Sequence, residues 1–128
     1  MRHRALAAAV ALCLAIPSAV AIRPAGSEPP PTYVAPVDAP VVDPFRPPSS
    51  PFGPGNRGLE YGTDAGAEVR AAADGVVTFA GLVAGTRHVT VLHPDGLRTS
   101  YSYLDRVDVV VGQHVEQGHV LGTTTGHL

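Results

Sequence analysis

The sequence feature that most constrains the fold is a run of alternating side chains near the C-terminal end. In residues 97–103, Leu, Thr, Tyr and Tyr alternate with Arg, Ser and Ser. Successive side chains of a strand point to opposite faces, so a period of two indicates a strand with one buried face. No stretch after residue 21 keeps a helical period over three turns. The sequence therefore predicts an all-β fold: a small open antiparallel sheet or sandwich of short hairpins.

The other expected strands are short and separated by glycine-containing turns. Asp74-Gly75 reads as a two-residue type I′ turn with positive φ at Gly75, and Pro94-Asp95-Gly96 reads as a second turn. The remaining strands are expected at 69–73, 76–80, 88–92, 107–111 and 119–121.

The N-terminal residues have the order of a secretory signal. Arg2 and Arg4 precede an apolar run over 5–16, and Ala19-Val20-Ala21 supplies small residues for cleavage. A spanning helix needs about 20 apolar residues, so stable membrane insertion is not expected. We predict a signal peptide at 1–21 and a protein that is secreted or in the cell envelope. The only cysteine, Cys13, lies within this signal.

Residues 22–54 differ in composition from the rest of the chain, because they contain eleven of the thirteen prolines. Such a segment predicts an extended, semi-rigid tether; a proline-rich recognition ligand is the alternative. Phe45 is expected to be buried against the domain that follows. That domain is predicted over 55–128, and Gly126-His127-Leu128 contains no turn that closes it, so it is expected to be incomplete at the C-terminus.

The net charge and the absence of lysine each argue against one class of function. Without Arg2 and Arg4 the formal net charge is −4, and every basic residue counted is arginine. An acidic surface of this kind does not favour nucleic acid as a partner. A lipoyl- or biotinyl-type carrier domain requires a lysine at a hairpin tip, and the sequence has none.

Several stretches together resemble the lysostaphin-type (LytM-like) family of peptidoglycan zinc metallopeptidases. The stretches that carry this resemblance are 57–60 (Arg-Gly-Leu-Glu), 66–77 with its Ala-Ala-Ala-Asp-Gly-Val-Val run, 93–101, 111–115, Gly118, Leu121-Gly122 and Gly126-His127-Leu128. The resemblance covers residues 52–128, and it implies a β domain that acts on cell-wall peptides.

The resemblance also implies positions for a zinc site, and this sequence differs from the family at the zinc-ligand positions. Asn56 stands where the family has its first histidine ligand, and Glu60 stands where it has an aspartate. Tyr103 replaces the histidine of a Tyr-x-His element. His127 corresponds to the family's general base, and the last histidine ligand would be the residue after Leu128. Zinc prefers nitrogen, sulfur or anionic oxygen over an amide oxygen, so no cofactor is expected, with zinc as the cofactor if the protein is active.

Each of these residues also has a purely structural interpretation. Asn56 and Glu60 are plausible turn residues on a solvated loop. Tyr101 and Tyr103 suit a core or a groove lining, and His93 is expected at the surface or at a sheet edge. His114 and His119 are expected to face solvent.

The sequence leaves two functions open. The first is a secreted, peptidoglycan-associated, metallopeptidase-like domain that does not cut, with peptidoglycan or a cell-wall hydrolase as its partner. The second is an active zinc endopeptidase that cleaves the peptide crosslinks of peptidoglycan. The identities of Asn56 and Glu60 favour the first function.

Overall fold

The computed structural model describes residues 29–128, so the predicted signal peptide and its cleavage site lie outside the described residues. Every regular element in this part of the chain is a strand, which confirms the all-β class. It contains no helix that is long and apolar enough to cross a membrane. The strands are β1 (Val41–Asp43), β2 (Glu60–Tyr61), β3 (Glu68–Arg70), β4 (Gly75–Val83), β5 (Thr86–Leu92), β6 (Arg98–Val107), β7 (His114–Val115) and β8 (Val120–Thr124).

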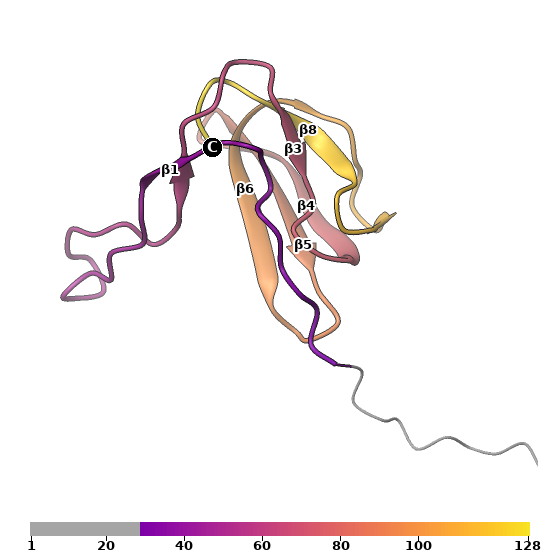
Figure 1. Ribbon diagram of the computed structural model, residues 1–128, viewed down its shortest axis with the longest axis horizontal. Coiled ribbons are helices and arrows are strands. Elements are labelled where there is room, and N and C mark those ends of the chain that lie inside the picture. Colours follow the sequence, from indigo (N-terminus) through magenta and orange to yellow (C-terminus); the bar gives the residue numbers. More distant parts are fainter. Residues whose placement is uncertain (1–28) are drawn as a thin grey trace, which may run out of the picture.

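Six of the strands form one antiparallel sheet in the order β3-β8-β6-β5-β4-β7. The long strands β4, β5 and β6 make up its body, and β1 pairs with β2 in a separate ribbon at one side (Figure 1). The sheet is curled rather than flat, and the register of several strand pairs shifts along their length. Such bulges increase the local twist of a sheet and bend the strand that carries them.

The turns at either end of β5 are tight. Val83 pairs with Thr86 across a two-residue loop, in which Ala84 and Gly85 have φ values of 49° and 80°, as a type I′ hairpin requires. The predicted turn at Pro94-Asp95-Gly96 is confirmed: Gly96 has a φ of 86°.

The predicted hairpin at Asp74-Gly75 is wrong. β3 pairs with β8 and not with β4, and Gly75 is the first residue of β4. Its neighbours explain why glycine stands there. A β-carbon at Gly75 would overlap the carbonyl oxygen of Leu92 and lie 2.6 Å from Cγ1 of Val91. Glycine is therefore needed for a close approach of two strands rather than for a positive φ.

Two further strand predictions need correction. The alternation over 97–103 marks β6, but Leu97 and Tyr103 are 60% and 46% exposed, so the buried face includes only part of the run. Tyr103 has a φ of 60°, and this conformation interrupts the alternation, so that the next buried side chain is Leu104. The predicted strand at 107–111 is absent, since β6 ends at Val107 and the residues that follow form a turn.

Part of the proline-rich segment lies against the sheet. We call residues 33–40 the strap. It is extended, as its composition indicates, but Arg70 N–H donates to Pro36 O at 2.8 Å, and Val37 is only 7% exposed. The predicted domain boundary at residue 55 therefore leaves out a segment that covers the outer edge of β3. The prediction that Phe45 is buried is wrong, because its side chain is 56% exposed.

The core lies between the curled sheet, the strap and the β1–β2 ribbon. Its fully buried large side chains come from β3, β4, β5, β6 and β8: Val69, Val77, Val89, Val91, Leu104, Leu121 and Thr124. Val37, Tyr61 and Leu128 add buried apolar surface from outside the sheet. The strap and the last residue are thus parts of the same packed unit as the sheet.

Candidate functional site

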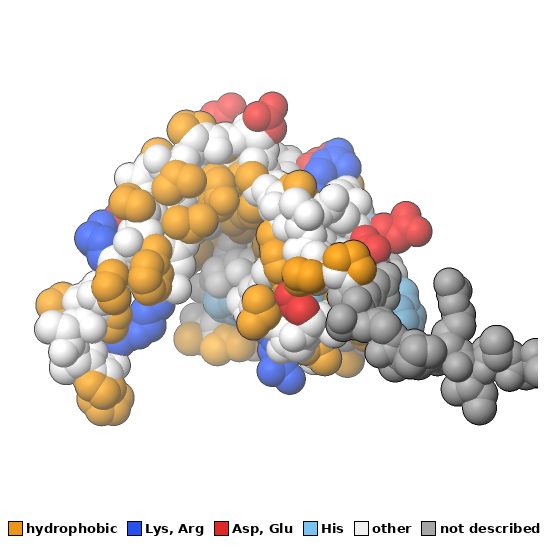
Figure 2. All heavy atoms as spheres, turned by 60° about the horizontal axis from the view of Figure 1, so that its bottom comes forward, with side chains coloured by type: hydrophobic (Ala, Val, Ile, Leu, Met, Phe, Trp, Pro, Cys, Tyr) orange, Lys and Arg blue, Asp and Glu red, His pale blue; other side chains and the backbone are white. Residues whose placement is uncertain are grey.

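A groove of about 540 Å³ separates the sheet from an arm of the molecule. We call residues 41–61 the arm; it contains β1, β2 and the loop between them. Figure 2 shows the molecule hollowed between the arm, at the left, and the main sheet. The groove is lined by residues 56–61 of the arm, residues 99–103 of β6, Ala72, Leu128, and Tyr33, Val34 and Pro36 of the strap.

All four tyrosines of the chain line this groove. Tyr61 and Tyr101 are buried, whereas Tyr33 and Tyr103 are 37% and 46% exposed. The prediction that Tyr101 and Tyr103 line a core or a groove is confirmed. Tyr61 directly follows Glu60, a predicted site position, whereas no motif near Tyr33 indicates a site. Exposed tyrosine rings combine apolar area with few rotatable bonds, which suits them to ligand contact.

The side chain of Asn56 is committed to the backbone of the arm. Its amide nitrogen lies 3.2 Å from Asp43 O and 3.3 Å from Pro44 O, and its amide oxygen accepts from Gly58 N–H at 3.0 Å. Its own backbone forms a bridge with Arg46. This is the geometry of an Asx turn that closes the loop, so Asn56 has a structural role in the arm.

Glu60 lies in the groove lining beside Asn56, and its side chain is exposed. Among residues 29–128, no three His, Cys, Asp or Glu side chains converge in a way that could hold a metal ion. The amide oxygen of Asn56 is oriented by its bond from Gly58 N–H, and an amide oxygen is a poor ligand for zinc. The described residues therefore do not fit the tetrahedral zinc site that a catalytic centre of this type requires.

Tyr103, in the middle of β6, lies beside His127. Their ring centroids are 4.7 Å apart with the planes tilted by 50°. Tyr103 O accepts bonds from both the N–H and the hydroxyl of Thr125, at 3.0 and 3.1 Å. These bonds hold Tyr103 at a positive φ, which is uncommon for a bulky residue and is often associated with functional sites. Three of the four predicted site residues line the groove, and His127 contacts the third of them, Tyr103.

A chain of hydrogen bonds supports the floor of the groove from below. His93 is 2% exposed, so the prediction that it lies at the surface or at an edge is wrong. One ring nitrogen of His93 lies 2.7 Å from Asp74 O, and the other lies 2.8 Å from Thr99 Oγ1. Thr99 Oγ1 is 2.8 Å from the Tyr101 hydroxyl, which accepts from Ala72 N–H at 2.8 Å. Burial raises the pKa of Tyr101, and its hydrogen bonds with Thr99 and Ala72 oppose that shift.

The direction of these bonds follows from the groups involved. Asp74 O can only accept, so the nitrogen of His93 that faces it carries the proton. In a neutral imidazole the second nitrogen then accepts from Thr99, and Thr99 accepts from Tyr101. Every polar atom along the chain has a partner, which holds Thr99 and Tyr101 in fixed orientations at the groove.

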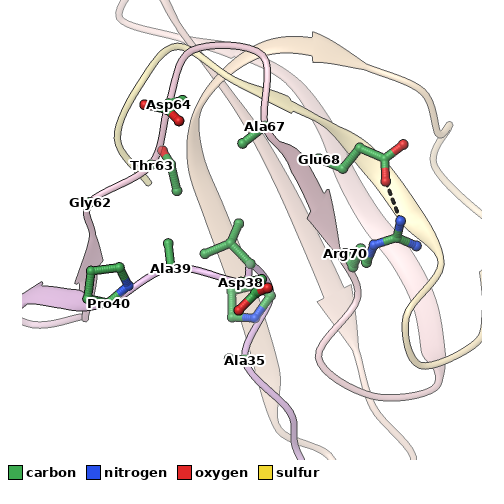
Figure 3. A pocket seen from close by; sticks show the side chains of 12 residues that line it. Ala35, Asp38, Ala39, Pro40, Gly62, Thr63, Asp64, Ala67, Glu68 and Arg70 are labelled. Carbon is green, nitrogen blue, oxygen red and sulfur yellow. Dashed lines mark hydrogen bonds and ion pairs between the residues drawn. The ribbon is translucent and has the colours of Figure 1, made fainter.

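Two other hollows lack a comparable arrangement. A pocket of about 690 Å³ lies between the strap and residues 62–70 (Figure 3). There Asp38 lies on the strap, Asp64 and Glu68 lie apart from each other within residues 62–70, and Glu68 is paired with Arg70. A third hollow is lined in part by His114 and His119. Both imidazoles are exposed, which confirms that they face solvent.

The chain is similar in sequence to known proteins. The sequence model described as Peptidase family M23 matches residues 54–127. An uncharacterised protein of Mycobacterium tuberculosis is 42% identical over 88 residues, which cover 68% of this chain and 35% of that protein. DD-carboxypeptidase/endopeptidase Mpg of Neisseria gonorrhoeae is 38% identical over 66 residues, covering 51% and 15%.

The fold is also similar to a solved structure. The solution structure of lysostaphin superposes with a TM-score of 0.55 and 25% sequence identity, covering 63% of this chain and 35% of that one. The chain spans only about a third or less of the length of the curated relatives described above. The family match nevertheless includes more than half of this sequence and all the groove residues contributed by the arm and β6. The protein belongs to peptidase family M23.

Proposed function

We propose that this protein is an exported, peptidase-like module that binds cell-wall peptidoglycan in the groove without cutting it. Family membership supports the choice of polymer, because the motifs of this chain resemble those of peptidases that act on peptidoglycan peptides. The order of charged, apolar and small residues at the N-terminus supports export. The net charge gives no reason to expect nucleic acid as a partner.

The observation that carries the non-catalytic part of this proposal is the bonding of Asn56. Both polar atoms of its side chain are used by the backbone of the arm. Rotation of this side chain towards a zinc ion would break the bonds that close the loop, and its amide oxygen is a poor zinc ligand in any orientation. Loss of even an outer partner of a zinc ligand typically reduces affinity or activity by about 10–100-fold, and loss of a direct ligand costs more.

The groove nevertheless keeps features that suit a polymer with a peptide backbone. β8 pairs with β6 only from Leu104 onwards, so residues 99–102 have no strand partner on that side among the described residues. These residues line the groove. Free strand edges bind extended peptides through backbone donors and acceptors. Leu59 of the arm, 49% exposed, supplies apolar surface across the groove.

Sedimentation with insoluble peptidoglycan tests this proposal. The purified protein should sediment with the polymer, and Leu59→Asp should remain in the supernatant, because a charge in the groove opposes desolvation on binding. Leu97→Asp is the matched control, since Leu97 is 60% exposed and lies outside the groove. Equal sedimentation of the two variants would contradict the groove as the site. A parent protein that never sediments would instead favour a cell-wall hydrolase as the partner.

A further inference from the structure

The groove contains residues that precede the part of the chain matched by the family's sequence model. The M23 match begins at residue 54, but Tyr33, Val34 and Pro36 of the strap form part of the groove lining. Segments that precede a shared domain commonly act as linkers, with no fixed place on its surface. The strap behaves differently, because it has a defined path along the sheet (Figure 1).

The backbone of the strap is hydrogen-bonded to the edge of the sheet. Val34 N–H donates to Ala72 O at 2.9 Å, and Pro36 O accepts from Arg70 N–H at 2.8 Å. Val37 anchors the segment in the core with 7% exposure. These contacts place the strap residues at the groove in one position rather than in an ensemble of positions.

Tyr33 is held most firmly of the strap residues that line the groove. Its hydroxyl donates to the carboxylate of Asp95, with 3.0 and 2.9 Å to the two oxygens. Its ring stands perpendicular to the ring of His93, with centroids 5.0 Å apart. His93 is itself fixed by Asp74 and Thr99. We call this arrangement of Tyr33, Asp95 and His93 the clasp.

The clasp determines how Tyr33 can meet a ligand. The hydroxyl is already bonded to Asp95, so the part of Tyr33 that remains for a ligand is the ring, and the residue is 37% exposed. An aromatic ring held in place before binding loses little rotational freedom on contact, and this raises affinity. Tyr103, the other exposed tyrosine of the groove, comes from β6, so the two rings belong to different segments.

We propose that Tyr33 is a specificity-determining contact residue: its clasped ring binds the wall polymer at the strap end of the groove. This assignment rests on the proposed function and deepens it. The strap is then part of the binding site, and proteins that share residues 54–127 without a tyrosine placed in this way differ in what they bind. The contact is apolar, because the phenol oxygen is occupied by Asp95.

Two variants separate contact by the ring from a purely structural role of the clasp. Asp95→Ala removes the partner of the Tyr33 hydroxyl and keeps the ring beside His93, whereas Tyr33→Ala removes both contacts. Hydrogen exchange at the Val34 amide reports the opening of the strap and needs no ligand. Both variants should speed that exchange, because each removes the bond between the Tyr33 hydroxyl and Asp95. Phe79→Ala is the matched control, because Phe79 is an aromatic residue with 38% exposure on β4, outside the groove.

The binding measurement is the polymer concentration that sediments half of the protein. Tyr33→Ala should raise it by about tenfold or more, as expected for the loss of an aromatic contact. The half-sedimentation concentration of Asp95→Ala should be lower than that of Tyr33→Ala by a factor of about three or more. Phe79→Ala should leave this concentration unchanged.

Three outcomes would overturn the assignment, and they are distinguishable. Equal weakening by Asp95→Ala and Tyr33→Ala would mean that Tyr33 acts only by holding the strap. Parent-like binding by Tyr33→Ala would leave the proposed function standing and remove Tyr33 from the site. A parent protein that does not bind the polymer would defeat the proposed function and this contact together.

Discussion

At the scale of single residues, several positions have a role that their residue type alone does not reveal. The resemblance predicts a ligand position of the family at Asn56, and in the structure its side chain closes a loop. His93 looked like a surface residue beside a turn, yet it is buried between Asp74 and Thr99. Such roles depend on partners that are distant in the sequence, so local patterns cannot predict them.

Gly75 offers a direct test at this scale. Gly75→Ala should lower the free energy of unfolding by about 1–3 kcal/mol, because the added carbon would overlap the Leu92 carbonyl oxygen. Gly81→Ala, in the same strand, is the control: its added carbon would come no closer than 3.5 Å to the flexible ring of Phe79, and it should change stability by less than about 1 kcal/mol. Denaturant unfolding of both variants measures the difference. Equal stabilities would show that the strand contact at Gly75 is misplaced.

The phenol of Tyr33 gives a second test. Partial desolvation and the bond to the Asp95 carboxylate raise the pKa of Tyr33 from 10.0 to about 12. The folded protein therefore keeps a proton that the unfolded chain loses, so this contribution to stability is present below pH 10 and is lost as the pH rises towards 12. Asp95→Asn removes the negative charge and should lower the pKa of Tyr33 towards its ordinary value. Ultraviolet titration of phenolate measures this pKa, with Tyr33→Phe as the reference that identifies the Tyr33 signal. An equal pKa of Tyr33 in the parent and in Asp95→Asn would contradict the bond between Tyr33 and Asp95.

At the scale of elements, the sequence predicts the strands better than it predicts their pairing. The period of two over 97–103 located β6, and the Pro94-Asp95-Gly96 turn is where expected. The pairing of β3 with β8 joins segments about fifty residues apart, which no local turn signal encodes. The proline-rich composition of residues 22–54 predicts a tether for the strap. Its anchoring depends on one buried valine and a few backbone bonds.

The strap makes a prediction at this scale. Val37→Ala should lower the free energy of unfolding by about 1–2 kcal/mol, because it removes two methyl groups from a residue that is only 7% exposed in the folded state. Val42→Ala on β1 is the control, since Val42 is 61% exposed. Chemical unfolding compares the two. If Val37→Ala is as stable as the control, the packing of the strap against the sheet does not contribute to stability, and the strap is only a tether.

At the scale of the whole molecule, the arm, the strap and the sheet enclose one groove that carries every tyrosine of the chain. The family resemblance predicted that Asn56, Glu60 and Tyr103 would come together, and all three line this groove. It did not predict the part contributed by the strap, which lies before the region matched by the family. Membership of the family is compatible with the proposed loss of its metal chemistry, because a groove can keep its surface after its ligands change.

Metal content follows from the same arrangement. The purified protein should hold well under one zinc per chain after gel filtration, because Asn56 is bonded to the arm and no three suitable side chains converge among the described residues. Elemental analysis measures this directly. Close to one equivalent of zinc that resists brief chelation would contradict the account of Asn56.

The measurement that tests the central claim most directly is the release of soluble fragments from purified peptidoglycan during incubation with the protein. Parallel samples contain added zinc, a chelator, or neither, and the pellet is assayed for bound protein. We predict that the protein is found in the pellet in all three samples and that no fragments are released above the level of polymer alone. Fragment release that zinc increases and the chelator abolishes would show that the groove is an active peptidase site, and would contradict the account.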